Sequence, residues 1–289
     1  MIVTRLLGGL GNQLFQYAIG RSLALRHGTQ LRLDTGYFAN QQLRSFRLRH
    51  LNMDAVELSD AERHTLRLSA PSGGLAGLWA RYFGRSTLTR VDERSFAFDA
   101  SVLNSPANSY LVGYWQSPKY FESIEDTIRA EARPRVPQSP ADADVAGQIG
   151  AMLSVAVHVR RGDYVRNPET SRYHGVCGLE YYMSAERYLL ERVGPCRLFV
   201  FSDDPAWVSQ NVRFRSPTTL VDHNDASRDY ADLQLMSLCR HHIIANSTFS
   251  WWGAWLCVNP DKVIIAPKQW FGEGAHSTRD LIPESWVRL

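Results

Sequence analysis

The stretch GGLGNQLFQYAIGRSLA, Gly8–Ala24, follows the short apolar run MIVTRLL that opens the chain. An apolar strand, a glycine turn and a helical pattern in this order are typical of the first unit of a nucleotide-binding α/β fold. The glycines partly match the G-x-G-x-x-G fingerprint, and Asp34 stands at about the spacing of a ribose-binding carboxylate. However, Leu14 replaces the third glycine, and the side chains of Asn12 and Gln13 would stand where a pyrophosphate needs bare backbone. The stretch therefore predicts an α/β unit, while a dinucleotide site stays open but weakened.

Short apolar runs alternate with helical patterns along the chain, and such alternation predicts parallel strands linked by helices. The predicted strands are Ile2–Leu7, Leu31–Asp34, Ser109–Tyr114, Ser154–Val159, Arg197–Ser202, His242–Asn246 and Lys262–Ala266. The predicted helices are Asn12–His27, Pro118–Glu131, Gly178–Val193, Asp229–Arg240 and Phe249–Val258. We therefore expect an α/β fold class.

The segment RPRVPQSPADAD, Arg133–Asp144, contains three prolines near the middle of the chain. Proline-rich segments between periodic stretches are typical of linkers. We therefore predict two α/β domains of similar size, residues 1–135 and 136–289, facing a central cleft. Residues 40–105 fit this pattern least, because they are arginine-rich and poorly periodic.

Composition narrows the classes of function. The chain has 289 residues, of which 44% are hydrophobic, enough for one large core or two moderate ones. Its net charge of +3 argues against a nucleic-acid partner held by bulk charge. None of the four cysteines forms a C-x-x-C pair, and Cys239 and Cys257 lie in apolar stretches, so we predict buried thiols in a reducing compartment. With neither a signal peptide nor a long apolar run, we expect a cytoplasmic protein.

The stretch VAVHVRRGDYV, Val155–Val165, carries the strongest chemical signal. Ligands bind at the carboxyl ends of parallel strands, and two adjacent arginines there would be costly without an anion. Because side chains alternate along a strand, His158 and Arg160 point the same way. We expect Arg160 to meet a phosphate, and Arg161 to pair with Asp163 or with loop backbone. The less favoured alternative is a surface Arg–Asp pair.

The stretch HHIIANSTFSWWGAWL, His241–Leu256, leads from a predicted strand into a helix that begins near Phe249. Serine and threonine at a helix start cap free N–H groups, and the same groups can hold an anion. Ordinary capping is the alternative and is compatible with phosphate binding. We expect the tryptophans of this stretch to pack in the core.

Acidic residues supply a second kind of recognition. Asp203 follows one predicted strand, and Asp229 and Asp232 stand at a helix start. A carboxylate can accept two parallel hydrogen bonds from the N1–H and N2–H₂ edge of guanine. A favourable charge at a helix N-terminus explains Asp229 or Asp232 equally well at this point.

Taken together, GGLGNQLFQYA, HVRRGDYV, FSDD and NSTFSWWGAWL resemble the bacterial α-1,2-fucosyltransferases of glycosyltransferase family 11, and GYWQSPKYF, Gly113–Phe121, matches a further stretch of that family. The resemblance implies a GT-B-like architecture of two Rossmann-like domains, with the acceptor domain at 1–135 and the GDP-fucose-binding domain at 136–289. It implies inverting transfer of L-fucose from GDP-β-L-fucose to the 2-hydroxyl of a terminal β-galactoside, such as lactose or a surface polysaccharide repeat. It also implies that no metal or other cofactor is needed.

The resemblance also implies roles for individual residues. Arg160 would bind the β-phosphate, Asp232 rather than Asp203 would accept from guanine, and Asn12 would face the sugar and acceptor. The predicted nucleotide-binding residues are His158, Arg160, Arg161, Asp203, Asp232, Asn246, Ser247, Thr248, Phe249 and Ser250. The predicted acceptor residues are Asn12, Gln13, Asp34 and Trp115. The predicted catalytic residues are Arg160, His158, Asp163 and Asn12, with the general base left open among His158, Asp163 and Asp34.

Two other classes of function compete with this interpretation. An NAD(P)-dependent oxidoreductase could use the N-terminal glycine loop, although Leu14 argues against it. A non-catalytic glycan-binding protein would suit the tryptophans, but would not need His158, Arg160 and Asp232 together. A separate hypothesis is peripheral contact with the inner face of a membrane through GLAGLWARYFGR, Gly74–Arg85, whose aromatics and arginines are typical of interfacial segments. A packed helix is the alternative for that segment.

Overall fold

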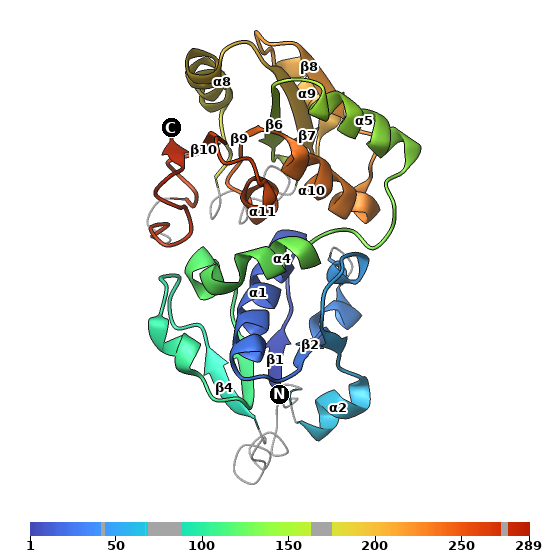
Figure 1. The fold of residues 1–289 in the computed structure, drawn as a ribbon, viewed down its shortest axis with the longest axis vertical. Helices are drawn as coiled ribbons and strands as arrows, with labels where there is room; N and C mark the ends of the chain where they lie inside the picture. The colour runs from blue at the N-terminus through green and yellow to red at the C-terminus, as the bar shows by residue number, and fades with distance from the viewer. Residues whose placement is uncertain (42–43, 67, 69–87, 163–174, 273–276) are drawn as a thin grey trace. The chain divides into compact units, whose positions relative to one another are not determined.

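The computed structural model describes residues 1–41, 44–66, 68, 88–162, 175–272 and 277–289. The chain divides into two compact units, Met1–Ala132 and Arg133–Leu289 (Figure 1). The sequence places the domain boundary between residues 135 and 136. Each unit contains a parallel sheet with helices, so the predicted α/β class is confirmed.

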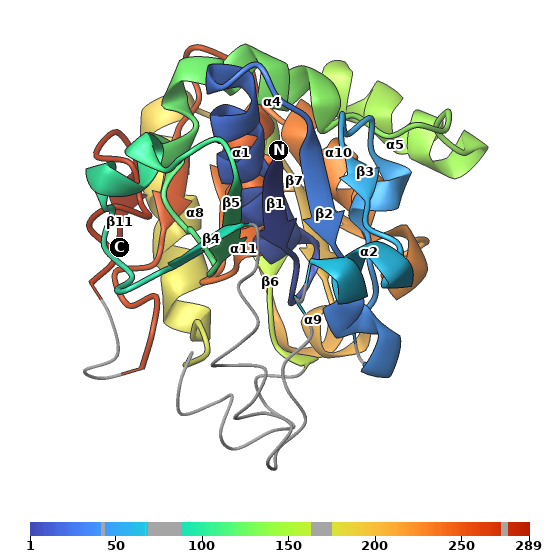
Figure 2. The same cartoon turned by 90° about the horizontal axis from the view of Figure 1, so that it is seen from below.

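Unit 1 is built on a five-stranded sheet with the order β3-β2-β1-β5-β4, and Figure 2 shows these strands side by side. All of its strand pairs are parallel. The strands are β1 Ile2–Arg5, β2 Leu31–Asp34, β3 Val56–Glu57, β4 Thr89–Asp92 and β5 Ser109–Val112. The α-helices are α1 Leu10–Arg26, α2 Asp60–Thr65 and α4 Glu125–Glu131, with short 3₁₀ turns at Gly36–Asn40, Leu48–His50, Ala100–Asn104, Pro118–Tyr120 and Glu122–Ile124.

Unit 2 is built on a six-stranded sheet with the order β11-β10-β9-β6-β7-β8, again with every pair parallel. The strands are β6 Ser154–Val159, β7 Arg197–Ser202, β8 Thr218–Val221, β9 His241–Ile243, β10 Ile264–Ala266 and β11 Val287–Arg288. The helices are α5 Pro140–Gly150, α8 Leu179–Val193, α9 Pro205–Asn211, α10 Asp229–Leu238 and α11 Thr248–Leu256, with a 3₁₀ turn at Ala226–Arg228.

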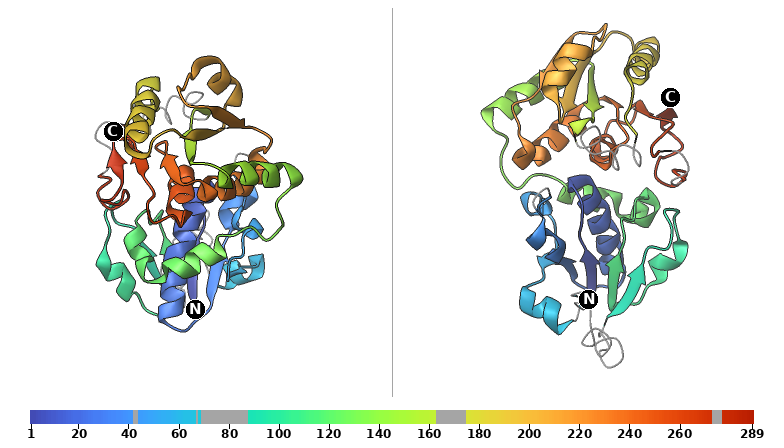
Figure 3. Two further views of the ribbon diagram at one scale, coloured as in Figure 1. Left: turned by 45° about the horizontal axis from the view of Figure 1, so that its top comes forward. Right: turned by 180° about the vertical axis from the view of Figure 1, so that it is seen from behind.

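The two faces of this second sheet follow from the alternation of side chains along β6. Val155 and Val157 pack on one face with α8 and α9, whereas Ala156 packs on the other with α5 and α10. Figure 3 shows α8, in olive, and the orange helices α10 and α11 on opposite sides of the strands. His158 has the parity of Ala156, so its side chain belongs to the α10 face. This alternation decides which helices can supply partners to the charged residues after β6.

Most predicted elements are confirmed to within a few residues, but two predictions are wrong in part. The predicted helix Pro118–Glu131 is interrupted, since Phe121 adopts φ −136° and places its ring in the core against Phe15. The predicted linker Arg133–Asp144 ends early, because α5 begins at Pro140. Ser139 caps that helix in a reciprocal pair with Asp142, and proline is favoured at the first helical position.

Two further expectations concern thiols and membranes. Cys196, Cys239 and Cys257 are buried and Cys177 is half-buried, and all four are free thiols, which confirms the buried thiols predicted at Cys239 and Cys257. Within the described part of the chain, no helix is both long enough and apolar enough to cross a bilayer. The segment Gly74–Arg85, on which the interfacial hypothesis rests, lies outside the described residues.

Substitution of two helical glycines, Gly20 and Gly147, is expected to change the stability of the fold in opposite directions. A Cβ on Gly20 of α1 would collide with Thr4 Oγ1 and lie 2.8 Å from Leu31 Cδ1, whereas a Cβ on Gly147 of α5 would meet nothing within 4 Å. We expect Gly20→Ala to cost about 1–3 kcal/mol through overpacking. Gly147→Ala should instead stabilise by about 0.5–1 kcal/mol through helix propensity. Thermal unfolding of the two variants checks this, and equal effects of the same sign would contradict the packing of α1 on β1.

Candidate active site

The carboxyl end of β6 brings the first group of predicted site residues together. The Arg160 guanidinium lies 3.2 Å from the Asp203 carboxylate, measured from Nε to Oδ2, and about a fifth of each side chain is exposed. Because β6 and β7 pair in parallel, with Val159 opposite Ser202, the loops that follow them start side by side. The sequence predicted both residues but not that they pair.

Asp203 also shapes the loop after β6. Its Oδ1 accepts a 2.8 Å hydrogen bond from the backbone N–H of Arg161. A Cβ on Gly162 would lie 2.6 Å from Asp203 Oδ2, so the close approach of loop and carboxylate needs a glycine there. Asp203 therefore positions the arginine loop, which is a different task from the nucleotide contact predicted for it.

Arg161 points to another partner than the one predicted. Its guanidinium carbon lies 3.7 Å from the centre of the Trp207 ring on α9, a cation–π arrangement. The predicted partner Asp163 lies outside the described residues. Among the described residues, Arg160 is paired with a carboxylate and Arg161 packs on an aromatic ring.

His158 is buried, with 3% of its surface exposed, and its Nδ1 has no hydrogen-bond partner among the described residues. Its ring centre lies 5.5 Å from that of Phe249. Burial, aided by the positive charge of Arg160, lowers the pKa of His158 to about 3. At neutral pH the ring is therefore uncharged, and a group with so low a pKa is a weak proton acceptor.

The N-terminus of α11 directly follows residues 244–247, the buried segment after β9. The Ser247 side chain accepts from the backbone N–H of Phe249 at 3.3 Å, while Thr248 and Phe249 are half-exposed. Asn246 and Ser250 are buried instead, and their side chains bond to protein carbonyls, those of Trp270 and Ala245 among them. The helix start therefore offers backbone N–H groups and half-exposed side chains, whereas Asn246 and Ser250 support the local fold.

Asp232 lies on α10, which packs against α11. Burial raises the pKa of Asp232 to about 7, and the negative charges of Asp142 and Asp229 act in the same direction. A hydrogen bond from Asn224, 2.9 Å from Nδ2 to Asp232 Oδ1, and the charge of His223 oppose this rise. Near neutral pH the Asp232 carboxyl is therefore present in both its protonated and its ionised form.

In unit 1 the predicted acceptor residues gather at the carboxyl edge of the sheet, but most of their polar atoms bond to the protein. Gln13 is fully buried and donates 2.9 Å hydrogen bonds to the carbonyls of Gly8 and Ser45, while its Oε1 accepts from the backbone of Arg47. Asn12 is half-buried, and its Oδ1 accepts from Gln116 at 3.0 Å. Gln13 therefore fastens the loop, and Asn12 is the more accessible of the two amides.

Asp34 and Trp115 are also buried. Tyr110 donates to Asp34 Oδ2 at 2.7 Å, and the backbone of Gly36 donates to the other oxygen at 3.0 Å. Trp115 is fully buried with a positive φ of 58°, an uncommon conformation for a bulky residue. Its indole Nε1 has no partner among the described residues.

The turn around Trp115 is held by a residue that the sequence analysis missed. Glu93 accepts from the backbone N–H groups of Tyr114 and Trp115 at 2.7 and 2.9 Å. The side chain of Tyr114 is 42% exposed at this turn. Glu93 stands in the poorly periodic region after residue 40, so its pattern gave no signal, whereas the aromatic Tyr114 could have been found beside Trp115.

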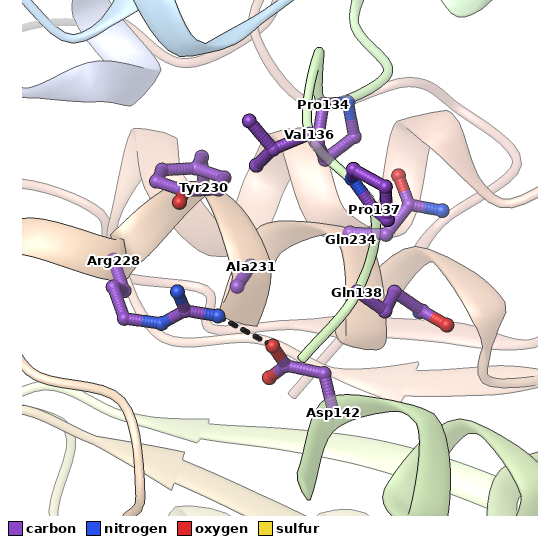
Figure 4. Close-up of a pocket in the computed structure, with 9 residues that line it drawn as sticks. All are labelled: Pro134, Val136, Pro137, Gln138, Asp142, Arg228, Tyr230, Ala231 and Gln234. Atoms are coloured by element: carbon purple, nitrogen blue, oxygen red, sulfur yellow. Dashed lines mark hydrogen bonds and ion pairs between the residues drawn. The ribbon is translucent and has the colours of Figure 1, made fainter. Parts of the chain in front are cut away.

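Other features carry less of the site. Among the described residues, no group of three or more His, Cys, Asp or Glu side chains could hold a metal ion, and the absence of a metal stays a prediction. Figure 4 shows a hollow with the Arg228–Asp142 ion pair at its edge. The hollow is lined by Pro134, Val136, Pro137, Gln138, Asp142, Arg228, Tyr230, Ala231 and Gln234.

Comparison with known proteins defines the class. The family model of glycosyl transferase family 11 matches residues 91–289. The alpha-1,2-colitosyltransferase of Escherichia coli is 35% identical over 100% of this chain and 99% of its own length. The O-antigen biosynthesis glycosyltransferase WbnK of Escherichia coli is 30% identical over 98% of both chains. The crystal structure of fucosyltransferase NodZ from Bradyrhizobium, 18% identical, gives a TM-score of 0.52 over 87% of this chain and 91% of its own, a likeness of fold.

The fold and these relatives define a glycosyltransferase of GT-B-like fold. The chain belongs to glycosyltransferase family 11, as its sequence motifs indicated. The two rival classes, an NAD(P)-dependent oxidoreductase and a non-catalytic glycan-binding protein, are set aside by this membership.

The raised pKa of Asp232 predicts a gain in stability when its charge is removed. The folded pKa of Asp232, about 7, lies above the ordinary value of 3.8. Stability therefore falls progressively as the pH rises from about 4 to 7, because the buried carboxyl must ionise over this range. We expect Asp232→Asn to stabilise the ligand-free protein by up to about 4 kcal/mol at pH 8 and by little at pH 4. Thermal unfolding across this range measures the difference, and a gain that is the same at both pH values would contradict burial of the charge as its cause.

Proposed function

We propose that the protein transfers L-fucose from GDP-β-L-fucose to the 2-hydroxyl of a terminal β-galactoside, with inversion at C1. The observation that carries the proposal is the Arg160–Asp203 pair at the end of β6, in the same unit as the N-terminus of α11 and Asp232. A guanidinium and a helix N-terminus suit a diphosphate, and a buried carboxylate suits the N1–H and N2–H₂ edge of guanine.

The identity of the sugar has one close competitor. A relative that spans the whole chain is named an alpha-1,2-colitosyltransferase, and colitose is L-fucose without its 3-hydroxyl. The name supports the α-1,2 linkage and makes GDP-colitose the second donor to test. A site that hydrogen-bonds the 3-hydroxyl would reject the deoxy sugar strongly, whereas an apolar site would discriminate weakly.

The reaction needs charge stabilisation more than it needs a base. The acceptor oxygen forms a bond to C1 while the bond from C1 to the β-phosphate oxygen breaks on the opposite face, through an oxocarbenium-like transition state. Negative charge develops on the departing diphosphate, where Arg160 and the N–H groups at the start of α11 stabilise it. In this proposal these groups do the work that a metal ion does in other transferases.

The acceptor hydroxyl must lose its proton, and the geometry narrows the candidates for the base. Neutral His158 is buried and weakly basic, and both carboxylate oxygens of Asp34 accept hydrogen bonds from the protein. Asp163 lies outside the described residues. We propose that the loss of the proton follows the breaking of the C1–O bond, so that the acceptor is already acidic when it is deprotonated.

Unit 1 supplies the acceptor side in this proposal. Asn12 and Gln116 form a hydrogen-bonded amide pair beside the turn that exposes Tyr114. An exposed aromatic ring beside amide groups suits a galactoside, because a sugar ring has one apolar face and hydroxyls around its edge. The buried residues of this edge do not contact the sugar in this proposal but support the edge from the protein interior; they are Gln13, Asp34 and Trp115.

The first test measures GDP release from GDP-fucose with lactose as the acceptor, in the presence of EDTA. We expect transfer without added metal, and a loss of at least about 100-fold in turnover for Arg160→Ala, comparable to the removal of an oxyanion-hole donor. Arg213→Ala is the matched control, because Arg213 is exposed and donates only to backbone carbonyls of Ser209 and Val212. Near-normal turnover of Arg160→Ala, or activity that EDTA abolishes, would contradict the proposed mechanism.

The second test separates the two substrates. We expect Asn12→Ala to leave the affinity for GDP unchanged, because the nucleotide groups lie in unit 2, and to lower transfer to lactose by about tenfold or more. Asn108→Ala serves as a control, since Asn108 precedes β5 at the amino edge of the same sheet and binds the N-terminal amine. If Asn12→Ala weakens GDP binding as much as transfer, the assignment of Asn12 to the acceptor is wrong.

A further inference from the structure

Asn224, in the loop between β8 and α10, joins two carboxylates. Its Nδ2 donates to Asp142 Oδ1 at 2.8 Å and to Asp232 Oδ1 at 2.9 Å. Its own Oδ1 accepts from Arg228 Nε at 2.8 Å. The arginine on one side and the acidic pair on the other fix which end of the amide faces which partner, so the side chain cannot flip without losing all three bonds.

Asp142 anchors this arrangement from α5. Only 1% of it is exposed, and it accepts from Ser139, His223, Asn224 and Arg228, the last at 2.6 Å (Figure 4). Burial alone would raise the pKa of Asp142, but the hydrogen bonds from Ser139, Asn224 and His223 outweigh it and bring the pKa well below its usual range. A helix cap needs Ser139 alone, so the other donors serve the loop rather than the helix.

We propose that Asn224 is a positioning residue for guanine recognition, which holds one oxygen of the Asp232 carboxylate and leaves both oxygens able to accept from the base. This inference rests on the proposed function, in which Asp232 binds guanine. Both oxygens are needed to accept from N1–H and N2–H₂ together, and an oxygen that already accepts one hydrogen bond keeps a second lone pair. Asn224 therefore fixes the rotation of the carboxylate without using up either oxygen.

The same amide favours the charged form of Asp232. The groups that face Asp232 are Asp142 on α5, Asp229 on α10 and His223 in the loop, with Arg228 bound to Asp142. The amide nitrogen of Asn224 also lies 3.3 Å from His223 Nε2. Without the N–H group between them, Asp142 and Asp232 would repel each other, and Asp232 would hold its proton to a higher pH. A protonated carboxyl presents an O–H to guanine N1–H, so it no longer accepts two bonds.

A merely structural role for Asn224 makes a different prediction. If Asn224 only stabilised the loop, its substitution should weaken the binding of every nucleotide equally and should leave the pH dependence of binding unchanged. A positioning residue affects only ligands that donate to Asp232, and affects them most at low pH. ADP supplies this contrast, because it has the same diphosphate but no N1–H donor.

The test measures the dissociation constants of GDP and ADP by calorimetry from pH 6 to pH 9, for the wild type, Asn224→Ala and Asn224→Ser. We expect Asn224→Ala to weaken GDP about tenfold at pH 7, as for one lost hydrogen bond, while ADP is unchanged. The pH below which GDP binding declines should rise, and the loss should shrink towards pH 9. Asn224→Ser, which retains one donor, should recover part of the affinity.

Asn259→Ala is the matched control, since Asn259 bonds to the backbone of Arg240 and Asp261 and contacts neither carboxylate. If the wild type prefers GDP but Asn224→Ala and Asn224→Ser weaken GDP and ADP equally, or leave the pH dependence of GDP binding unchanged, the positioning role is wrong while the proposed function stands. If the wild type binds GDP no better than ADP, the guanine-binding role of Asp232 fails, and the inference fails with it.

Discussion

The site depends on the way the protein holds the positive charge of Arg160 when no phosphate is present. Two adjacent arginines after a buried strand repel each other and need an anion. Asp203 supplies one through a partly exposed 3.2 Å contact from the neighbouring strand, and Arg161 turns away onto Trp207. A contact that long and that exposed is weak enough for a diphosphate to replace. Because Asp203 also holds the Arg161 backbone, the start of the loop has an anchor that does not depend on the Arg160 guanidinium, which is the preorganisation that the proposed charge stabilisation requires.

The two units use their polar side chains in different ways. In unit 2 the side chains of Arg160 and Asp203 are partly exposed at the sheet edge, where an incoming anion can reach them. In unit 1 the amides of Gln13 and Gln16 are buried and bond to loop backbone, so these two polar residues of the opening motif shape the loop, whereas Asn12 is the more accessible amide. The positive φ of Trp115 also shapes the surface of unit 1, and it is held by the two hydrogen bonds that Glu93 accepts from the backbone of Tyr114 and Trp115. A strained turn persists only where its surroundings fix it.

Sequence periodicity could predict the strands that are buried on both faces, and could not predict the others. The ranges of β6 and β7 agree with the predicted ones. A mostly apolar run of this length is typical of a strand that is buried on both faces of a parallel sheet covered by helices. Strand β3 has two exposed residues, and β8 reads TTLV, so neither carries such a run. Arg160 was predictable because charges at a strand end stand out locally. Asp142 was hidden inside a proline-rich stretch, and its bond to Asn224 spans 82 positions, a distance at which a single sequence holds no signal.

Asp232 connects stability with recognition. A carboxylate buried among Asp142 and Asp229 destabilises the empty protein near neutral pH, and only a ligand that donates hydrogen bonds to it compensates fully. In the proposed function guanine does so, and its binding would lower the pKa of Asp232, so nucleotide binding near pH 7 would release a proton. An adenine base offers no N1–H and leaves the charge unpaired, so the cost of burying Asp232 becomes a penalty against the wrong nucleotide. Under the proposed function the destabilised carboxylate would therefore be a source of specificity, and the donors around it would set the pH range in which that specificity operates.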